Sequence, residues 1–112
     1  MVPAAPVTAS VYRAIACETR RTLLDALLRR EQTVSDLVEV AGVSQPAVSQ
    51  QLKVLQRAGL VAERRQGRYR FYRVKGEPLA EVLAWVHAYE KFWSGRLEAL
   101  GLVLDQGKRR ER

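Results

Sequence analysis

The stretch from Ser44 to Gly59 constrains the fold most, because signals for the start, the buried face and the end of one helix coincide in it. Ser44 is a favourable N-cap, since its hydroxyl can accept a hydrogen bond from a first-turn amide that has no other partner. Pro46 follows in the first turn, where a missing N–H costs little, and Gly59 stands where helices commonly end. Apolar residues recur at helical spacing and predict one buried stripe, formed by Val48, Leu52 and Leu55.

The opposite face of this predicted helix has no acidic and no large apolar residue. It carries amides, a hydroxyl and cations, namely Gln45, Ser49, Gln50, Lys53 and Arg57. Amide side chains can pair with adenine edges in the major groove of DNA, and lysine and arginine bind phosphates. The stretch therefore predicts a DNA-recognition helix. We expect base contacts from Gln45, Ser49 and Gln50. We expect phosphate contacts from Ser44, Lys53 and Arg57.

A shorter helix is predicted directly before the recognition helix. Thr33 and Asp36 are spaced as a capping box, with aspartate in place of the usual glutamate. Gly42 is placed to end this helix, and its expected buried face consists of Val34, Leu37, Val38 and Ala41. Two amphipathic helices joined by a short turn that contains glycine form the helix-turn-helix pattern.

A basic hairpin is predicted after the recognition helix. Residues 68–74 alternate with period two and are rich in aromatic and β-branched side chains, which is typical of a strand. Gln66-Gly67 offers the positive φ that a tight hairpin turn needs. The predicted fold is mainly α-helical with one β-hairpin, which is a winged helix-turn-helix. We expect the wing to contact the DNA backbone or the adjacent minor groove through Arg64, Arg65, Arg68 and Arg70.

The excess positive charge of the chain lies in this same region. Residues 44–75 hold eight cations and a single acid, Glu63, so their net charge equals the +7 of the whole chain. Such a concentration indicates a polyanionic partner, and we expect double-stranded DNA. RNA is a weaker candidate, because side chains reach the grooves of A-form helices poorly.

Further helices are predicted on both sides of the DNA-binding region. Thr8 or Ser10 caps a first helix, residues 20 to about 30 form a second one, and Pro78 opens a long last helix that reaches Leu104. The last helix has an almost heptad apolar seam that this short chain would leave partly exposed. We therefore expect a homodimer through the first and last helices, with interface residues Val11, Ile15, Leu79, Leu83, Val86, Trp93, Leu97 and Leu100.

Length and composition indicate one folded domain. The 112 residues suffice for one modest core, and no apolar run approaches the ~20 residues of a membrane helix. The single cysteine fits a cytoplasmic protein. We expect residues 1–7 to be a flexible leader and not a signal peptide, residues 8–104 to be the DNA-binding and dimerisation domain, and residues 105–112 to be a disordered charged tail. No catalytic triad or phosphate loop is apparent, so we predict neither an enzyme nor a cofactor.

Several strings of the chain resemble the ArsR/SmtB family of bacterial winged-helix transcription regulators. They occupy residues 20–28, 43–55, 58–61 and 65–68, and the resemblance extends over about residues 8–104. It implies a homodimer that binds a palindromic operator, commonly as a repressor. The aromatic last helix resembles the metal-free branch typified by SdpR-type autorepressors, through Trp85, Tyr89, Phe92 and Trp93.

The resemblance also bears on metal binding. Many metal sensors of the family have a Cys-Val-Cys string where this chain has Thr33-Val34-Ser35, so that soft-metal site is missing. His87 and Glu90 match half of a nickel or zinc site on the last helix, but the other half would fall on Val74 and Gly76, which cannot ligate a metal. We therefore expect no metal.

Three alternatives stay open at this point. One is a nickel or zinc sensor that uses His87 and Glu90, and another is a thiol-responsive sensor that uses Cys17, both on the same DNA-binding body. The third is a protein-interaction module in which the last helix binds a different protein.

Overall fold

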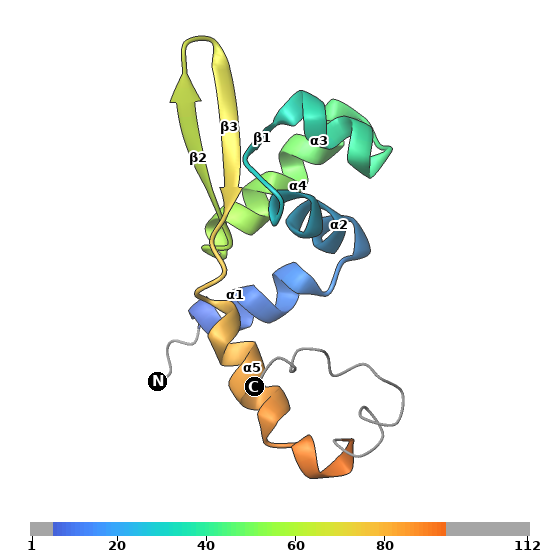
Figure 1. Ribbon diagram of the computed structural model, residues 1–112, viewed down its shortest axis with the longest axis vertical. Coiled ribbons are helices and arrows are strands. Elements are labelled where there is room, and N and C mark those ends of the chain that lie inside the picture. Colours follow the sequence, from blue (N-terminus) through green and yellow to red (C-terminus); the bar gives the residue numbers. More distant parts are fainter. Residues whose placement is uncertain (1–5, 94–112) are drawn as a thin grey trace. The chain divides into compact units, whose positions relative to one another are not determined.

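A computed structural model describes residues 6–93, with side chains from residue 11 onward (Figure 1). The elements in chain order are α1 (Pro6–Ile15), α2 (Glu18–Leu27), β1 (Gln32–Thr33), α3 (Val34–Ala41), α4 (Gln45–Arg57), β2 (Val61–Gln66), β3 (Tyr69–Val74), α5 (Leu79–His87) and the 3-10 helix η1 (Glu90–Phe92). The chain divides into two compact units, residues 1–82 and residues 83–112.

The helix-turn-helix formed by α3 and α4 has the caps that its sequence predicts. The backbone N–H of Asp36 donates to the Thr33 hydroxyl, and the Thr33 N–H donates to the Asp36 carboxylate. The donor–acceptor distance is 3.2 Å in both hydrogen bonds. Gly42 ends α3 in the left-handed region at φ +70°. The Ser44 hydroxyl accepts from the Ala47 N–H at 3.3 Å at the start of α4. Because each cap contributes ~1 kcal/mol, local chemistry fixes where both helices begin and how they are joined.

The apolar stripe of α4 lies in the core of the first unit. Val48, Leu52 and Leu55 are at most 1% exposed. They belong to one cluster with residues of α2, α3 and the turn before β2, including Leu23, Leu27, Leu37 and Leu60. This packing orients the opposite, polar face of α4 outward.

The second helix differs from its prediction at its C-terminal end. We expected it to run to about Arg30, but α2 ends at Leu27, and Leu28 is 72% exposed. Leu28 is the C-cap, so it lies beyond the last turn that packs on the core.

The wing is a three-stranded sheet and not the two-stranded hairpin that the sequence predicted. β2 and β3 pair antiparallel along their whole length, with Gly67 at φ +62° in the turn. β1 pairs with the other edge of β3 and places Gln32 opposite Tyr72, so the strand order is β1-β3-β2. The Gln32 side chain is buried, and its amide nitrogen donates to the Ala26 carbonyl at 2.7 Å, so this buried donor has a partner. A strand of two residues carries no periodicity, so it left no signal in the sequence.

The last helix begins after Pro78 as predicted but is shorter than expected. α5 ends at His87, and a turn and η1 follow it. Aromatic residues there have only moderate helix propensity, and helices in proteins gain most of their stability from packing an apolar face. The rest of the predicted last helix lies outside the described residues.

The predicted leader and tail are only partly described. α1 begins at Pro6, so two residues of the expected 1–7 leader are helical. Residues 1–5 and the expected tail, residues 105–112, lie outside the described residues. No helix of the described part is long and apolar enough to cross a membrane.

Two arginines of α2 hold the C-terminal end of α1. Arg20 Nε donates to the Ala14 carbonyl, and Arg21 Nη1 donates to the Ile15 carbonyl. The donor–acceptor distance is 2.7 Å in both hydrogen bonds. The last carbonyls of a helix lack intrahelical partners, and a cation also suits the negative end of the helix dipole. Arg20 Nη1 donates as well to the amide oxygen of Gln51 in α4. One side chain therefore links α1, α2 and the predicted recognition helix.

Candidate nucleic-acid interface

The polar face of α4 is open to solvent. The described structure leaves every predicted DNA-binding residue of this helix and its cap exposed, namely Ser44, Gln45, Ser49, Gln50, Lys53 and Arg57. The cause is the burial of the apolar stripe on the other side of the helix. The orientation of the face is thus as expected, while its contacts with DNA stay a prediction.

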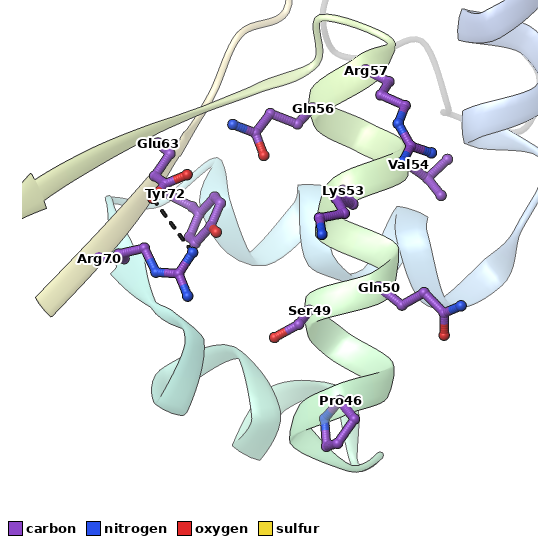
Figure 2. A pocket seen from close by; sticks show the side chains of 10 residues that line it. All are labelled: Pro46, Ser49, Gln50, Lys53, Val54, Gln56, Arg57, Glu63, Arg70 and Tyr72. Atoms are coloured by element: carbon purple, nitrogen blue, oxygen red, sulfur yellow. Dashed lines mark ion pairs between the residues drawn. The ribbon is translucent and has the colours of Figure 1, made fainter.

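A groove of about 600 Å³ separates α4 from the wing (Figure 2). Figure 2 shows Ser49 on the side of α4 that faces the strands, and Gln50 and Arg57 pointing away from them. The wall formed by α4 consists of Pro46, Ser49, Gln50, Lys53, Val54, Gln56 and Arg57, and the wall formed by the wing consists of Glu63, Arg70 and Tyr72. Of the predicted helix residues, Ser49, Gln50, Lys53 and Arg57 line the same groove as Arg70 of the wing.

Three polar residues of this groove were not predicted. Gln56 lies two helical turns after Ser49, so helical spacing could have found it. Glu63 and Tyr72 are direct cross-strand partners of β2 and β3. Their place in the groove depends on the register of the hairpin, which the sequence alone did not supply.

Gln45 lies at a second, smaller hollow. It measures about 190 Å³ and is lined by the start of α3, the start of α4 and the wing, through Thr33, Val34, Ser35, Gln45, Arg68, Tyr69 and Arg70. Arg70 lines both hollows, so this arginine is shared by the two polar surfaces that flank α4.

Arg64 is held by its own chain. Its Nη2 lies 2.7 Å and its Nε 3.2 Å from the same carboxylate oxygen of Glu31, in the loop before β1. The guanidinium carbon lies 4.7 Å from the ring centroid of Phe71, within range of a cation–π contact. The hydrogen bond from Arg64 lowers the pKa of the Glu31 carboxyl below its ordinary value. Of the predicted DNA contacts, Arg64 is therefore the one with the strongest competing partner.

Arg65 and Arg70 share a different acid. The Glu63 carboxylate lies 3.7 Å from Arg65 Nε and 3.6 Å from Arg70 Nη1. Burial, and then the charge of Glu63, raises the pKa of the Tyr72 hydroxyl that faces the same groove. Arg68, in the hairpin turn, forms no ion pair within residues 6–93.

The predicted dimer residues fall into several environments. Val11 is fully buried within the chain, while Ile15 and Leu79 pack against the core of the first unit. In the second unit, Leu83 is 68% exposed, and Val86 and Trp93 are half-buried. The remaining two, Leu97 and Leu100, lie outside the described residues.

The second unit also exposes aromatic side chains. The Trp85 and Tyr89 rings are 5.3 Å apart, and the Tyr89 and Phe92 rings are 6.2 Å apart, measured between centroids. All three side chains are exposed. Monomeric proteins seldom expose contiguous apolar patches of this kind, so this surface is a candidate for contact with a partner.

The candidate sensor residues lie on both units. His87 Nδ1 is 3.3 Å from a carboxylate oxygen of Glu90. The residues of the described part include no cluster of three or more His, Cys, Asp or Glu side chains that could hold a metal. Cys17 is partly exposed at the start of α2, where the backbone amide of Arg20 lowers the pKa of the thiol.

Comparison with known proteins decides the family. The family described as "bacterial regulatory protein, arsR family" matches residues 17–63, from the start of α2 into β2. The transcriptional repressor SdpR of Bacillus subtilis is 30% identical over 77 residues, which cover 69% of this chain and 86% of SdpR. The chain belongs to the ArsR family. It is accordingly a DNA-binding transcriptional regulator and not an enzyme.

Two further proteins are similar over most of this chain. A probable mercury resistance operon repressor of Streptomyces lividans is 34% identical over 103 residues, covering 92% of this chain and 82% of that protein. The solution structure of the homodimeric winged helix-turn-helix domain Mb0332 of Mycobacterium bovis is 30% identical, with a TM-score of 0.62 over 82% of this chain and 94% of that domain. The winged helix-turn-helix fold is therefore confirmed.

Proposed function

We propose that this ArsR-family regulator is a repressor that binds a palindromic operator as a homodimer. The observation that carries the proposal is the exposed polar face of α4, which forms one wall of a groove whose other wall is the basic wing. The relatives SdpR and the mercury operon protein are named as repressors, which supports the sign of regulation. In the proposed complex, two copies of α4 enter successive major grooves ~34 Å apart.

The proposed roles follow the placement of the side chains. Gln45, Ser49 and Gln50 read base edges, and Gln50 is favoured because it points away from the wing and is exposed. The phosphate contacts come from Ser44, Lys53 and Arg57 on α4 and from Arg65, Arg68 and Arg70 on the wing. Arg64 contributes less, because Glu31 holds it.

The proposed dimer forms through α1 and α5. The exposed Leu83 and aromatic residues of the second unit support this assignment, as does the homodimeric state of Mb0332. We also propose that the chain belongs to the metal-free, SdpR-like branch, with residues 8–104 as the DNA-binding and dimerisation domain. Hydroxyl side chains at Thr33 and Ser35, in place of thiolates, support the assignment to that branch.

The test is binding to DNA from the promoter region of the protein's own gene, with a shuffled duplex of equal composition as control. Footprinting locates the operator, and fluorescence anisotropy gives both affinities. We expect protection of two symmetric half-sites and tighter binding to the operator than to the shuffled duplex. Gln50→Ala should lower operator affinity by about tenfold with little effect on the shuffled duplex, since a good base contact is worth ~1–3 kcal/mol. An equal loss on both duplexes would contradict base reading by Gln50.

A further inference from the structure

We propose that the Glu63 carboxylate competes with DNA phosphates for Arg65 and Arg70. Glu63 thereby lowers the affinity of the wing for any duplex. The inference rests on the proposed DNA-binding function and adds a residue that opposes it. Its carboxylate occupies the partner position that a phosphate oxygen takes when Arg65 and Arg70 bind DNA. Sequence preference is left to the side chains of α4.

The location of Glu63 is the first argument. It is the single acid among eight cations in residues 44–75, so its charge is not one of many in that region. It lies on the groove side of the wing, because Arg70 and Tyr72 line the same groove opposite Lys53 and Ser49. Its side chain is 22% exposed, so the carboxylate remains reachable from the groove. A phosphate that enters between α4 and the wing must approach this carboxylate.

The geometry of the ion pairs is the second argument. At 3.6 and 3.7 Å, the contacts of Glu63 with Arg70 and Arg65 are longer than the 2.7–2.9 Å of charge-assisted hydrogen bonds. In contrast, Arg64 donates hydrogen bonds to the Glu31 carboxylate, and the shortest of them measures 2.7 Å. The short pair positions its arginine, whereas Glu63 supplies charge without fixing the orientation of either guanidinium.

The energetic consequence has one direction. On binding, Arg65 and Arg70 exchange the carboxylate for phosphate, and the carboxylate is left close to the negative backbone. Both effects oppose association, and neither depends on base sequence, because phosphates are alike in every duplex. Glu63 therefore lowers the affinity for operator and non-operator DNA by the same factor.

The experiment compares Glu63→Gln with the unchanged chain on operator and shuffled duplexes over a range of salt concentrations. The change keeps the shape of the side chain and removes its charge. We expect roughly tenfold tighter binding to both duplexes at low salt, and a slope of log affinity against log salt that is steeper by about one. Glu63→Asp, which keeps the charge, should bind within about threefold of the unchanged chain.

Glu39→Gln is the matched control, because it removes an equal charge from an exposed acid of α3 that forms no ion pair within the described residues and does not line the groove. We expect it to tighten binding by less than about threefold. Equal effects of Glu39→Gln and Glu63→Gln would overturn the inference, since they would reflect net charge alone. Unchanged or weaker binding by a folded Glu63→Gln variant would also overturn it, since the carboxylate would then position the arginines. If the unchanged chain does not prefer its operator, the proposed function fails, while the shuffled duplex still tests Glu63.

Discussion

At the scale of single residues, the wing contains arginines of different availability. Arg64 is committed to Glu31 and Phe71, Arg65 and Arg70 share Glu63, and Arg68 forms no ion pair within the described residues. An arginine that is paired with a carboxylate must give up this ion pair before it binds a phosphate. The loss of the ion pair offsets part of the free energy of the phosphate contact. We therefore expect Arg68, in the hairpin turn, to contribute its full charge to the proposed complex with DNA.

This difference predicts how the salt dependence of DNA binding responds to mutation. Arg68→Ala should weaken binding to every duplex and make the slope of log affinity against log salt shallower by about one. Arg64→Ala is the matched control on the same wing, and its slope should change less, because the loss of Arg64 also frees the charge of Glu31. Anisotropy titrations at several salt concentrations measure both slopes. An unchanged slope for Arg68→Ala would show that the turn does not reach the DNA backbone.

The residue-level site divides into a part that sequence reasoning can reach and a part that it cannot. Ser49 and Lys53 were found because helix caps and a period of 3.6 are local properties that fix which face is buried. Glu63 entered the site through its pairing with Tyr72 across the hairpin, and Glu31 reaches Arg64 across 33 residues of sequence. Such contacts depend on tertiary folding. The sequence therefore showed that Glu63 is the single acid of the basic region, but it did not predict that Glu63 lines the groove.

At the scale of elements, Arg20 is the junction between the first helix and the recognition helix. Its guanidinium donates to carbonyls at the end of α1 and to the side chain of Gln51 in α4. This part-buried cation also suits the negative end of the α1 dipole. The orientation of α1, and with it one part of the proposed dimer surface, is therefore tied to α4, the proposed recognition helix.

We predict that Arg20→Met lowers the free energy of unfolding by ~2 kcal/mol, because hydrogen bonds from a charged donor contribute more than neutral ones. Arg21→Met is the matched control, since within the described residues the exposed Arg21 side chain makes one hydrogen bond, to the Ile15 carbonyl, and its loss should cost less than ~1 kcal/mol. Urea unfolding at one fixed protein concentration, followed by circular dichroism, measures both values. Equal losses for the two variants would argue against a special role for the Arg20 junction.

The same distinction between local and distant signals explains which elements were predicted. α3 and α4 were foreseen because their caps and apolar stripes lie within each segment. β1 was missed because its two residues become a strand only when they pair with β3, which is distant in sequence. The early end of α5 was missed because the heptad seam indicates how a helix would pack with a partner, and not how far it extends in a single chain.

At the scale of the whole molecule, the proposed function needs two DNA-binding units at a fixed spacing. The exposed apolar side chains of the second unit are the described surface best suited to hold two copies together, and Leu83 is the most exposed of its large hydrophobic residues. A charge placed at the centre of such an interface has no partner and cannot be desolvated without a large cost. The dimer should therefore be sensitive at Leu83 while the fold of each chain is not.

We predict that Leu83→Glu yields a folded monomer whose operator affinity falls by at least about a hundredfold, because the two half-sites are no longer bound together. Leu28→Glu is the matched control, since Leu28 is exposed to a similar degree, 72% against 68%, but lies at the end of α2. That variant should remain dimeric and bind the operator normally. Sedimentation velocity measures the assembly, and circular dichroism shows that both variants stay folded. A dimeric Leu83→Glu variant would move the interface away from α5, and loss of the dimer in Leu28→Glu instead would move it to the exposed end of α2.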